Sequence, residues 1–353
     1  MKQGNKKTIY LIIRFIVSLL LAAIFGGIIF SMAGFSAIEV YVYIIKAAFG
    51  SLTAILTTLH HATPLLFTGM AFMFASKAGI LNLGTEGQLY VGGMVAALVG
   101  AYLPQLPYPL EIPFIILCGC VASGLYAMIA AYLHVKFSAN LVILTLMMNY
   151  VSQLFCSYLV SYPLKDEQGI ARTKKIYDSA VLDRLIPSHY LSKAVLIAFF
   201  VVIFCYFFLK YAKFGYHMKA VGLNKAASVS AGIKTKKVIL ISMFISGAIA
   251  GLCGVTQVLG VQYRFMSDFS SGFGFQGIAV AALAYNNPLA LFFSAILWGG
   301  IKAGASEVNR IASVPMDVIM NIQALVVIFV AAPNLLDFIL TPVRKILLKG
   351  EKV

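Results

Sequence analysis

The sequence has 353 residues, of which 61% are hydrophobic and only 11% are charged, and its mean hydropathy is +0.93. A soluble fold needs more charge on its surface, so this composition excludes an ordinary globular protein and indicates a polytopic membrane protein. The net charge of +15 does not indicate a nucleic-acid-binding protein, because the basic residues lie in a few short segments between apolar runs. That distribution is the one the positive-inside rule describes.

The chain begins with Lys2, Lys6 and Lys7, which precede the apolar run Ile9–Phe30. This run is longer than the apolar region of a signal peptide, about 7–15 residues, and is long enough to cross a bilayer core of about 30 Å. Although Ser31–Ala33 resembles a cleavage site, we interpret residues 9–33 as a first span whose basic start lies inside the cell.

Four further spans are predicted in the first half of the chain, and an interfacial segment precedes them. Residues 37–49 carry Glu39 and Lys46, so they are too charged to cross the bilayer and are expected at its outer interface. The predicted spans are Leu52–Ala75, Gly87–Leu103, Pro113–His134 and Asn140–Val160.

The span Leu52–Ala75 contains Pro64, which is expected to break it, and the pair His60 and His61. A histidine at membrane depth is a candidate functional residue. The simpler interpretation is a hydrogen bond within the bundle near the outer end, and we favour it. The role of the pair stays open.

The stretch Lys77–Gly93 is the most informative part of the sequence. It holds five glycines together with Asn82, Thr85, Glu86 and Gln88, yet it lies between two apolar runs. A carboxylate at membrane depth costs about 2.5–3.5 kcal/mol on insertion scales, so such residues face protein or water and mark pathways. The span that follows would reach only about 25 Å as a helix, which favours a discontinuous helix at 82–88. A short polar loop between two spans is the alternative.

Two hydrophilic segments occupy the middle of the chain. Residues 161–193 hold six basic and four acidic residues with turn-forming Pro163, Gly169 and Pro187, which fits an external loop. After the span Ala194–Leu209, residues 210–237 hold seven lysines and no acidic residue, the strongest cytosolic marker in the sequence. A lipid-contacting basic loop would not need the alanines within this segment, so we expect a short helix pair that docks on a cytosolic partner.

The second half repeats features of the first. A glycine-rich span, Val238–Val261, precedes Ser271–Asn287, where Gly274-x-x-Gly277 echoes Gly84-x-x-Gly87. In the span Asn140–Val160, Asn149 falls near mid-bilayer and either joins helices or lines a pore. The remaining predicted spans are the short run that ends the second break, Pro288–Ala303 and Met316–Ala332.

These spans predict an all-α polytopic membrane protein with about ten transmembrane helices, broken helices and both termini inside. Similar units in opposite orientation are typical of inverted-repeat transporters. We treat 1–353 as one transmembrane domain, made of a first half 9–160, an external loop 161–193, a linking span 194–212, a cytosolic loop 213–237, a second half 238–332 and a cytosolic tail 333–353.

Several kinds of chemistry are absent from the sequence. It has no G-x-x-x-x-G-K-[ST] phosphate-binding loop, no H-E-x-x-H motif and no paired carboxylates at membrane depth. Its five cysteines all lie in apolar runs and none belongs to a C-x-x-C pair, so no disulfide, metal site or cofactor is expected. A conduit is therefore favoured over a membrane enzyme, and any energy from nucleotide hydrolysis must come from another chain.

Segments in order along the chain resemble the permease subunits of bacterial ATP-binding-cassette (ABC) importers for simple sugars and nucleosides. The resemblance runs from about residue 48 to about residue 331 with family-like spacing. The segments that carry it are Ala48–Ser51, His61–Gly69, Ala78–Gln88, Thr145–Tyr150, Lys219–Ala227, Ala231–Ile233, Ile245–Gly251 and Gly272–Pro288. Residues 162–169 and 277–288 look most like the nucleoside branch. Leu81 and Leu83 replace the family's usual Phe and Ile, and Tyr285 stands where a basic residue is frequent.

The resemblance implies a four-part importer in the bacterial plasma membrane. Its other parts are an extracellular substrate-binding lipoprotein, a second permease, identical or not, and a cytosolic ATPase. It implies coupling to the ATPase through Lys219, Ala220, Val221, Gly222, Asn224, Ala226, Ala227, Ala231 and Gly232. It implies a translocation pathway at Asn82, Thr85, Glu86, Gln88, Asn149, Phe275 and Gln276.

Two questions about this function stay open at the level of sequence. Glu86 is expected to anchor the broken helix by accepting backbone N–H groups, and contact with substrate hydroxyls is the alternative. The rival function is a secondary transporter that works alone, with Glu86, His60 and His61 as its ion sites, and the rival substrate is a pentose or hexose.

Overall fold

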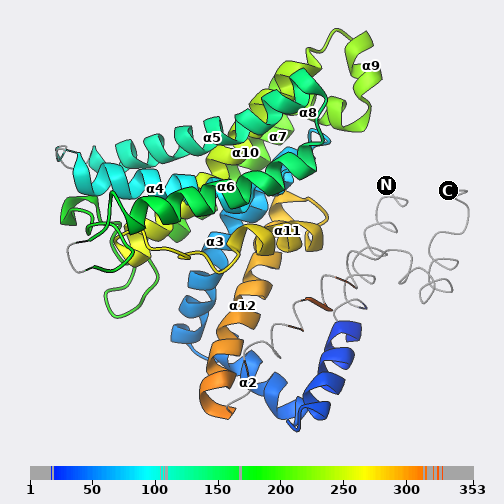
Figure 1. The fold of residues 1–353 in the computed structure, drawn as a ribbon. Helices are drawn as coiled ribbons and strands as arrows, with labels where there is room; N and C mark the ends of the chain where they lie inside the picture. Colours follow the sequence, from blue (N-terminus) through cyan, green and yellow to red (C-terminus); the bar gives the residue numbers. More distant parts are fainter. Residues whose placement is uncertain are drawn as a thin grey trace, which may run out of the picture. The chain divides into compact units, whose positions relative to one another are not determined.

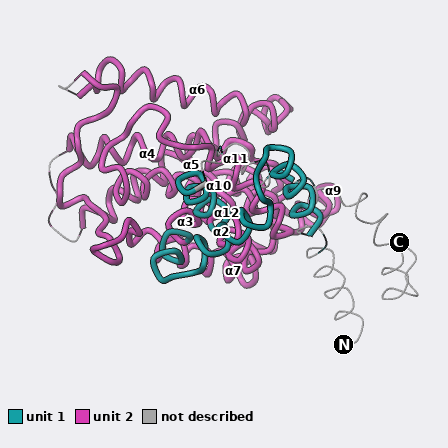
Figure 2. Tube along the Cα trace, turned by 90° about the horizontal axis from the view of Figure 1, so that it is seen from below, with its two compact units in different colours: residues 1–58, 300–353 teal, residues 59–299 magenta. Residues whose placement is uncertain are grey.

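The computed structural model describes residues 20–103, 110–166 and 169–312, and the isolated residues 17, 105, 107, 315, 321, 324, 325 and 328. The chain divides into two compact units, residues 1–58 with 300–353 and residues 59–299 (Figure 2). Two long helices, α3 and α12, contain the boundaries between these units.

Most of the described residues are helical, as predicted for an all-α protein, and their only β-type pairings are two isolated bridges. After a first helix at Leu20–Met32, the helices are α2 (Ala37–Phe49), α3 (Leu52–Ser76), α4 (Thr85–Tyr102), α5 (Glu111–Phe137), α6 (Leu141–Ser161), α7 (Ala194–Tyr211), α8 (Lys213–Leu223), α9 (Lys225–Ser230), α10 (Thr235–Gln257), α11 (Phe273–Leu283) and α12 (Pro288–Ala312) (Figure 1). A 3₁₀ turn at Asp178–Ala180 and a π-helical turn at Val258–Gln262 complete the set.

Five of the described helices are long and apolar enough to cross a membrane, namely α5, α6, α7, α10 with its π-helical turn, and α12. A sixth span results if Leu20–Met32 and α2, which are bent by 119° at their junction, count as one. The polytopic all-α class is confirmed, and the count of ten spans stays a prediction. The predicted span 316–332 and the tail 333–353 lie outside the described residues apart from four isolated positions, as does most of residues 9–19.

The prediction that Pro64 breaks its span is wrong, since α3 runs without interruption from Leu52 to Ser76. A proline removes only one backbone N–H, the one that would donate to the carbonyl four residues earlier, so a membrane helix can continue through it. On either side of this position the hydroxyls of Thr63 and Thr68 donate to the carbonyls of Leu59 at 2.7 Å and Pro64 at 3.1 Å, which are ordinary bonds of a hydroxyl to its own helix.

In unit 1, α2 lies against its neighbours through specific contacts. The Tyr41 hydroxyl donates to the carbonyl of Ala23 at 2.6 Å, and its ring meets Phe30 edge-on at 5.7 Å. Gly304 of α12 lies so close to α2 that an added Cβ would meet the Cα of Ile44 at 2.8 Å. The segment 37–49 is therefore a packed helix, and its place at a membrane interface stays a prediction.

The core of unit 2 is a close three-helix packing of α4, α5 and α10. An added Cβ at Gly251 would meet the side chain of Ser123 at 2.5 Å or less, and one at Gly247 would meet the carbonyl of Ser123 at 2.6 Å. An added Cβ at Gly119 would meet the side chain of Val255. These pairings make α5 and α10 antiparallel, and small residues allow the two backbones to approach this closely.

Hydrogen bonds and ion pairs join the segment between α6 and α7 to the chain that follows the π-helical turn. The Thr173 N–H donates to the carbonyl of Phe265 at 2.9 Å, and the Phe265 N–H donates back to the Thr173 hydroxyl at 3.0 Å. Asp166 pairs with Arg172 at 2.9 Å and with Arg264 at 3.5 Å. The described part of residues 161–193 is therefore held against the chain that follows α10.

Candidate functional site

The start of α4 gathers most of the predicted pathway residues into one buried cluster. We call Asn82, Thr85, Glu86, Gln88 and Asn149 the polar junction; each is at most 2% exposed. Four of them come from the link after α3 and the first turn of α4, and the fifth comes from the middle of α6. Thr85, Glu86 and Gln88 lie within the continuous helix α4, so the break itself is the link before Thr85. Whether this link lies at membrane depth or in the cytosol stays a prediction.

Asn82 joins three segments of unit 2. Its amide exchanges two hydrogen bonds of 3.0 Å with the amide of Gln88, and its oxygen also accepts from the N–H of Gly84 at 3.0 Å. Its nitrogen donates to the hydroxyl of Ser246 on α10 at 2.8 Å, and Ser246 donates to the carbonyl of Ala71 on α3 at 2.7 Å. The network satisfies buried amides that would otherwise be costly, and it holds α3, α4 and α10 at one point.

Asn149 holds the same region from the side of α6. Its oxygen accepts from the N–H of Gly87 at 2.7 Å, and its nitrogen donates to the carbonyl of Leu83 at 2.8 Å. The first-turn N–H groups of a helix lack partners within the helix, so Asn149 acts as a remote cap for α4. Gly87 allows this approach, because a Cβ there would lie 2.9 Å from the Cα of Asn149.

Glu86, at the start of α4, joins the first glycine-rich break to the second, which leads into α11. The Glu86 carboxylate accepts from the N–H of Gly274 at 2.5 Å, and the Thr85 hydroxyl donates to the carbonyl of Gly274 at 3.2 Å. Gly274 lies in the first turn of α11, where an acceptor satisfies a free N–H and a negative charge opposes the helix dipole favourably. This is the kind of bond that the anchoring interpretation of Glu86 predicts.

The remaining predicted pathway residues lie on α11 and differ in exposure. Phe275 is 47% exposed, whereas Gln276 is partly buried and donates to the carbonyl of Ser271 at 2.9 Å. The side-chain oxygen of Gln276 is buried and has no hydrogen-bond partner. Among the predicted pathway residues, these two are therefore the ones with a free face or an unused acceptor.

Sequence reasoning missed three hydroxyl residues that complete the cluster. Ser246 bridges α3 and the link, Ser123 donates to the carbonyl of Gln88 at 2.9 Å, and Thr68 donates to the carbonyl of Phe273 at 2.9 Å. Each stands in an apolar helix among small residues, and serine and threonine in such helices join neighbouring helices. That signal was available, although it does not say which helix each residue contacts.

The predicted coupling segment forms the expected pair of short helices, α8 and α9, which project at one end of unit 2 (Figure 1). Met218 and Val221 are buried against the bundle, whereas Leu223 is 87% exposed and Val229 is 58% exposed. Ala220 is half-buried. The other predicted coupling residues are exposed, namely Lys219, Gly222, Asn224, Ala226, Ala227, Ala231 and Gly232. Exposed apolar residues on a charged projection are typical of a protein-binding surface.

Gly222, at the end of α8, lies against the turn that follows α3. A Cβ added to Gly222 would clash with the carbonyl of Lys77 and lie 2.9 Å from the nitrogen of Gly79, which has a φ of +71°. Burial, together with the nearby charge of Lys219, lowers the pKa of the Lys77 side chain. The projecting helices are therefore in backbone contact with the link that leads into the polar junction.

A cleft of about 650 Å³ lies where the link, the turn between α5 and α6, and the projecting helices come together. Its walls include Leu81 of the link, His134 and Asn140 of the α5–α6 turn, and Gly222 and Lys225 of the projection. The cleft is therefore bordered by the projecting helices, the link and the start of α6.

Within residues 20–103, 110–166 and 169–312, no group of three or more His, Cys, Asp or Glu side chains could hold a metal ion. The rings of His60 and His61 meet edge-on at 5.4 Å on α3, away from the residues of the polar junction in the sequence. The described arrangement holds the starts of α4 and α11 and the middle of α6 together through buried hydrogen bonds.

Comparison with known proteins identifies relatives of this chain. Residues 54–331 match the family described as the permease component of branched-chain amino acid transport systems. The guanosine ABC transporter permease protein NupP of Bacillus subtilis is 32% identical over 94% of this chain and 96% of its own length. The nucleoside ABC transporter permease protein NupB of Lactococcus lactis is 27% identical over 99% and 100%. The glucose ABC transporter permease protein TsgB13 of Haloferax volcanii is 28% identical over 89% and 85%. No solved structure matches the chain.

Proposed function

The chain belongs to the family of permease components of branched-chain amino acid transport systems, and on this basis we propose that it forms the membrane conduit of an ABC importer for nucleosides. As a member of this family it is a multi-pass cytoplasmic-membrane protein and a transport subunit, not an enzyme. It works with an ATP-binding subunit and a substrate-binding protein.

The observation that supports coupling to a separate ATPase is the contact of α8 with the link after α3. The projecting helices expose Leu223 and Val229 to a partner, while Gly222 touches the backbone at 77–79. Movement of the projection on ATP binding would displace the link, and the polar junction would pass that movement to α4, α6 and α11. The coupling residues face the cytosol in this proposal, and so do both termini.

The pathway is proposed to open where α11 meets the polar junction. In the described conformation the junction is closed, because its side chains are occupied by one another and by backbone groups. Phe275 is partly exposed, and Gln276 has a buried unused acceptor, so both are suited to contact a nucleoside. An aromatic face stacks on a base, and an amide pairs with its edge. Opening requires the Glu86–Gly274 contact to move as a unit or to break.

Nucleosides are proposed as substrates because two relatives that align along nearly their whole length carry guanosine or nucleoside in their names. The name of a third relative carries glucose, so a sugar substrate is the second candidate. We propose a pairing with an unlike second permease, because the nucleoside branch that the sequence resembles often uses two.

Uptake of radiolabelled guanosine into proteoliposomes tests this function. Vesicles containing this chain with its ATPase, second permease and binding protein are expected to accumulate guanosine only with internal ATP, and unlabelled glucose is expected not to compete. Guanosine uptake driven by a proton or sodium gradient, in vesicles with this chain alone, would instead establish the secondary-transporter function. ATP-dependent uptake of radiolabelled glucose, with no uptake of guanosine, would establish the sugar substrate.

A further inference from the structure

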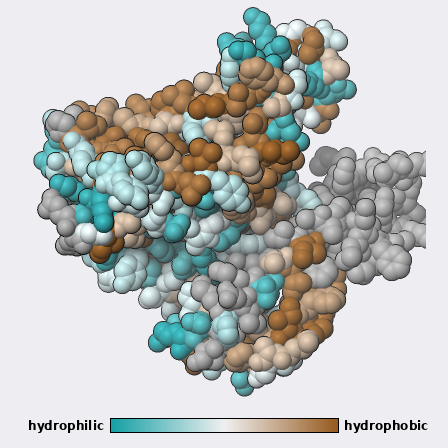
Figure 3. Space-filling model, in the orientation of Figure 1, coloured by the Kyte–Doolittle hydropathy of each residue, from teal (hydrophilic) through white to brown (hydrophobic). Residues whose placement is uncertain are grey.

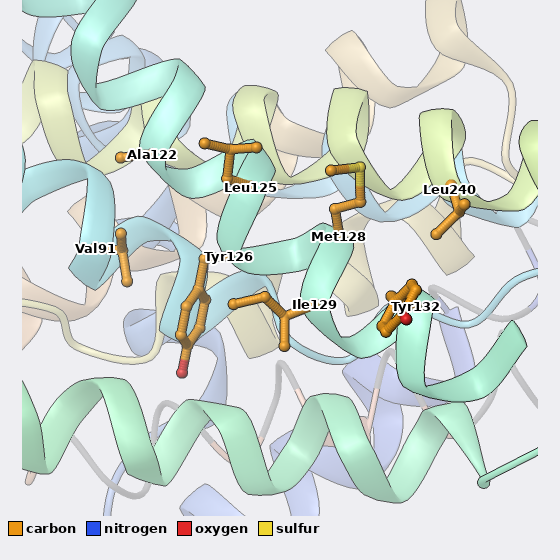
Figure 4. A pocket seen from close by; sticks show the side chains of 8 residues that line it. All are labelled: Val91, Ala122, Leu125, Tyr126, Met128, Ile129, Tyr132 and Leu240. Carbon is orange, nitrogen blue, oxygen red and sulfur yellow. The ribbon is translucent and has the colours of Figure 1, made fainter. Parts of the chain in front are cut away.

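One face of α5 carries an apolar groove. It measures about 530 Å³, and its walls come from α5, with one residue each from α4 and α10 (Figure 4). Its open side is formed by Leu125, Ile129 and Tyr132, which are 48%, 52% and 48% exposed. The lining is almost wholly apolar, and the Tyr126 hydroxyl is already occupied by the carbonyl of Met148 at 2.7 Å.

The two faces of α5 are built differently. The face toward α10 uses Gly119, Ser123, Gly124 and Ala127, which allow backbones to touch. Apart from Ala122, the groove face carries branched, aromatic and long side chains, which hold a neighbouring helix at a distance. Close helix association in membranes depends on small residues, so the groove face fits a flexible acyl chain better than a second packed helix.

Three lysines lie at the level of one end of the groove. Because α5 and α10 are antiparallel, with Gly119 beside Val255 and Gly247 beside Ala127, the end of α5 lies level with the start of α10. Lys136 follows Tyr132 by one turn and lies 5.3 Å from the centre of its ring. Lys236 and Lys237 precede the groove residue Leu240 by one turn, so all three lysines flank the same end, and all three are exposed.

We propose that this groove binds an anionic phospholipid, whose acyl chain lies along α5 and whose phosphate is held by Lys136, Lys236 and Lys237. Basic pockets between membrane helices on the cytoplasmic side recognise such head groups, and each lysine near the surface strengthens the attraction. The hydrophobic surface over the long helices of unit 2 provides the surroundings that an acyl chain requires (Figure 3). Only the side of the membrane depends on the proposed function; lipid binding does not.

Native mass spectrometry of the purified full chain tests the lipid site directly. Palmitoyl-oleoyl phosphatidylglycerol is expected to remain bound more strongly than phosphatidylcholine with the same chains. The double variant Lys136→Gln/Lys236→Gln should bind phosphatidylglycerol about 30-fold more weakly, given the loss of two lysines. It should lose much less affinity for phosphatidylcholine, whose phosphate is balanced by the choline charge. The matched double variant Lys213→Gln/Lys225→Gln removes the same charge from α8 and α9 and should leave phosphatidylglycerol binding unchanged.

The proposal would be overturned by equal loss of binding in both double variants, by no preference for phosphatidylglycerol, or by binding of glycerophosphate as tight as that of the whole lipid. A phosphatidylglycerol with a photoreactive acyl chain should label the peptide that contains Leu125 and Ile129 more than Leu154 on α6, which is 71% exposed. Cross-linking of that peptide to a second permease instead would also overturn it. None of these measurements involves transport, so failure of the transport function would leave the result intact.

Discussion

Substitution of Gly222 is expected to uncouple the conduit from its ATPase. In Gly222→Ala, the new Cβ would meet three backbone atoms: the carbonyl oxygen of Lys77, the nitrogen of Gly79 at 2.9 Å and the carbonyl carbon of Ala78 at 3.2 Å. Backbone atoms cannot rotate away as a side chain can, so α8 must move from the link. Overpacking of this kind costs about 1–3 kcal/mol.

This free-energy cost applies only to conformations in which α8 contacts the link. It therefore shifts the equilibrium toward conformations that lack this contact. A shift of about 1–3 kcal/mol corresponds to a change of about 5–150-fold in the equilibrium. Gly222→Ala should therefore lower ATP-driven uptake by about an order of magnitude, and Gly222→Arg should abolish it. The protein should still reach the membrane, because Gly222 lies at the end of a projection and not in the three-helix core.

The assay measures guanosine uptake and ATP hydrolysis in the same proteoliposomes. Hydrolysis that continues without uptake identifies uncoupling, whereas the loss of both, with loss of the assembled complex, identifies failed docking. The matched control is Gly27→Ala, whose new Cβ would have its nearest neighbour at 3.5 Å, an ordinary contact. Normal uptake in both Gly222 variants would refute the assignment of α8 as the coupling element.

Three further predictions concern the polar junction and the core. Glu86→Ala leaves the buried N–H of Gly274 without its acceptor and should lower the free energy of unfolding by about 1–3 kcal/mol. Glu86→Gln keeps an acceptor oxygen and should lower it by less. Equal melting temperatures for the two variants would contradict the anchoring bond. Asn82→Ala and Ser246→Ala should show a coupling energy of about 0.5–3 kcal/mol in a double-mutant cycle of thermal unfolding. If the two changes in the free energy of unfolding simply add, the two side chains act independently. Gly254→Ala should prevent close packing of α4 on α10, because its Cβ would overlap the carbonyl of Leu89, so monodisperse protein should be recovered in much lower yield than for Gly27→Ala. A yield equal to that control would argue against the packing described for the core.

Much of the helical architecture was predictable from local sequence. The predicted span 140–160 corresponds to α6 at Leu141–Ser161, and 113–134 corresponds to α5 at Glu111–Phe137. Apolar runs bounded by polar or charged residues mark helix limits because the chain must satisfy its backbone groups internally in lipid. The same reasoning failed at Pro64, because a proline's effect depends on what neighbouring groups do for the backbone, and here α3 continues through it.

The polar junction shows a different limit. Its members were singled out because amides and a carboxylate are costly inside a membrane, and that reasoning needs no partner. Which groups satisfy them could not be read from spacing. Glu86 and Gly274 are 188 residues apart, and Asn82 and Ser246 are 164 apart.

The sequence by itself determined that this chain is helical, crosses a membrane and has a lysine-rich segment between two spans. It also determined that the glycine-rich breaks hold polar side chains whose transfer into a membrane is unfavourable. These properties follow from composition, periodicity and the transfer cost of single residues, which are all local quantities. Only the tertiary structure decided that the two breaks meet at Glu86, that Gly222 touches the link and that lysines of α5 and α10 flank one groove. Such contacts join residues far apart in the chain, and they depend on how glycine-lined faces bring α4, α5 and α10 together.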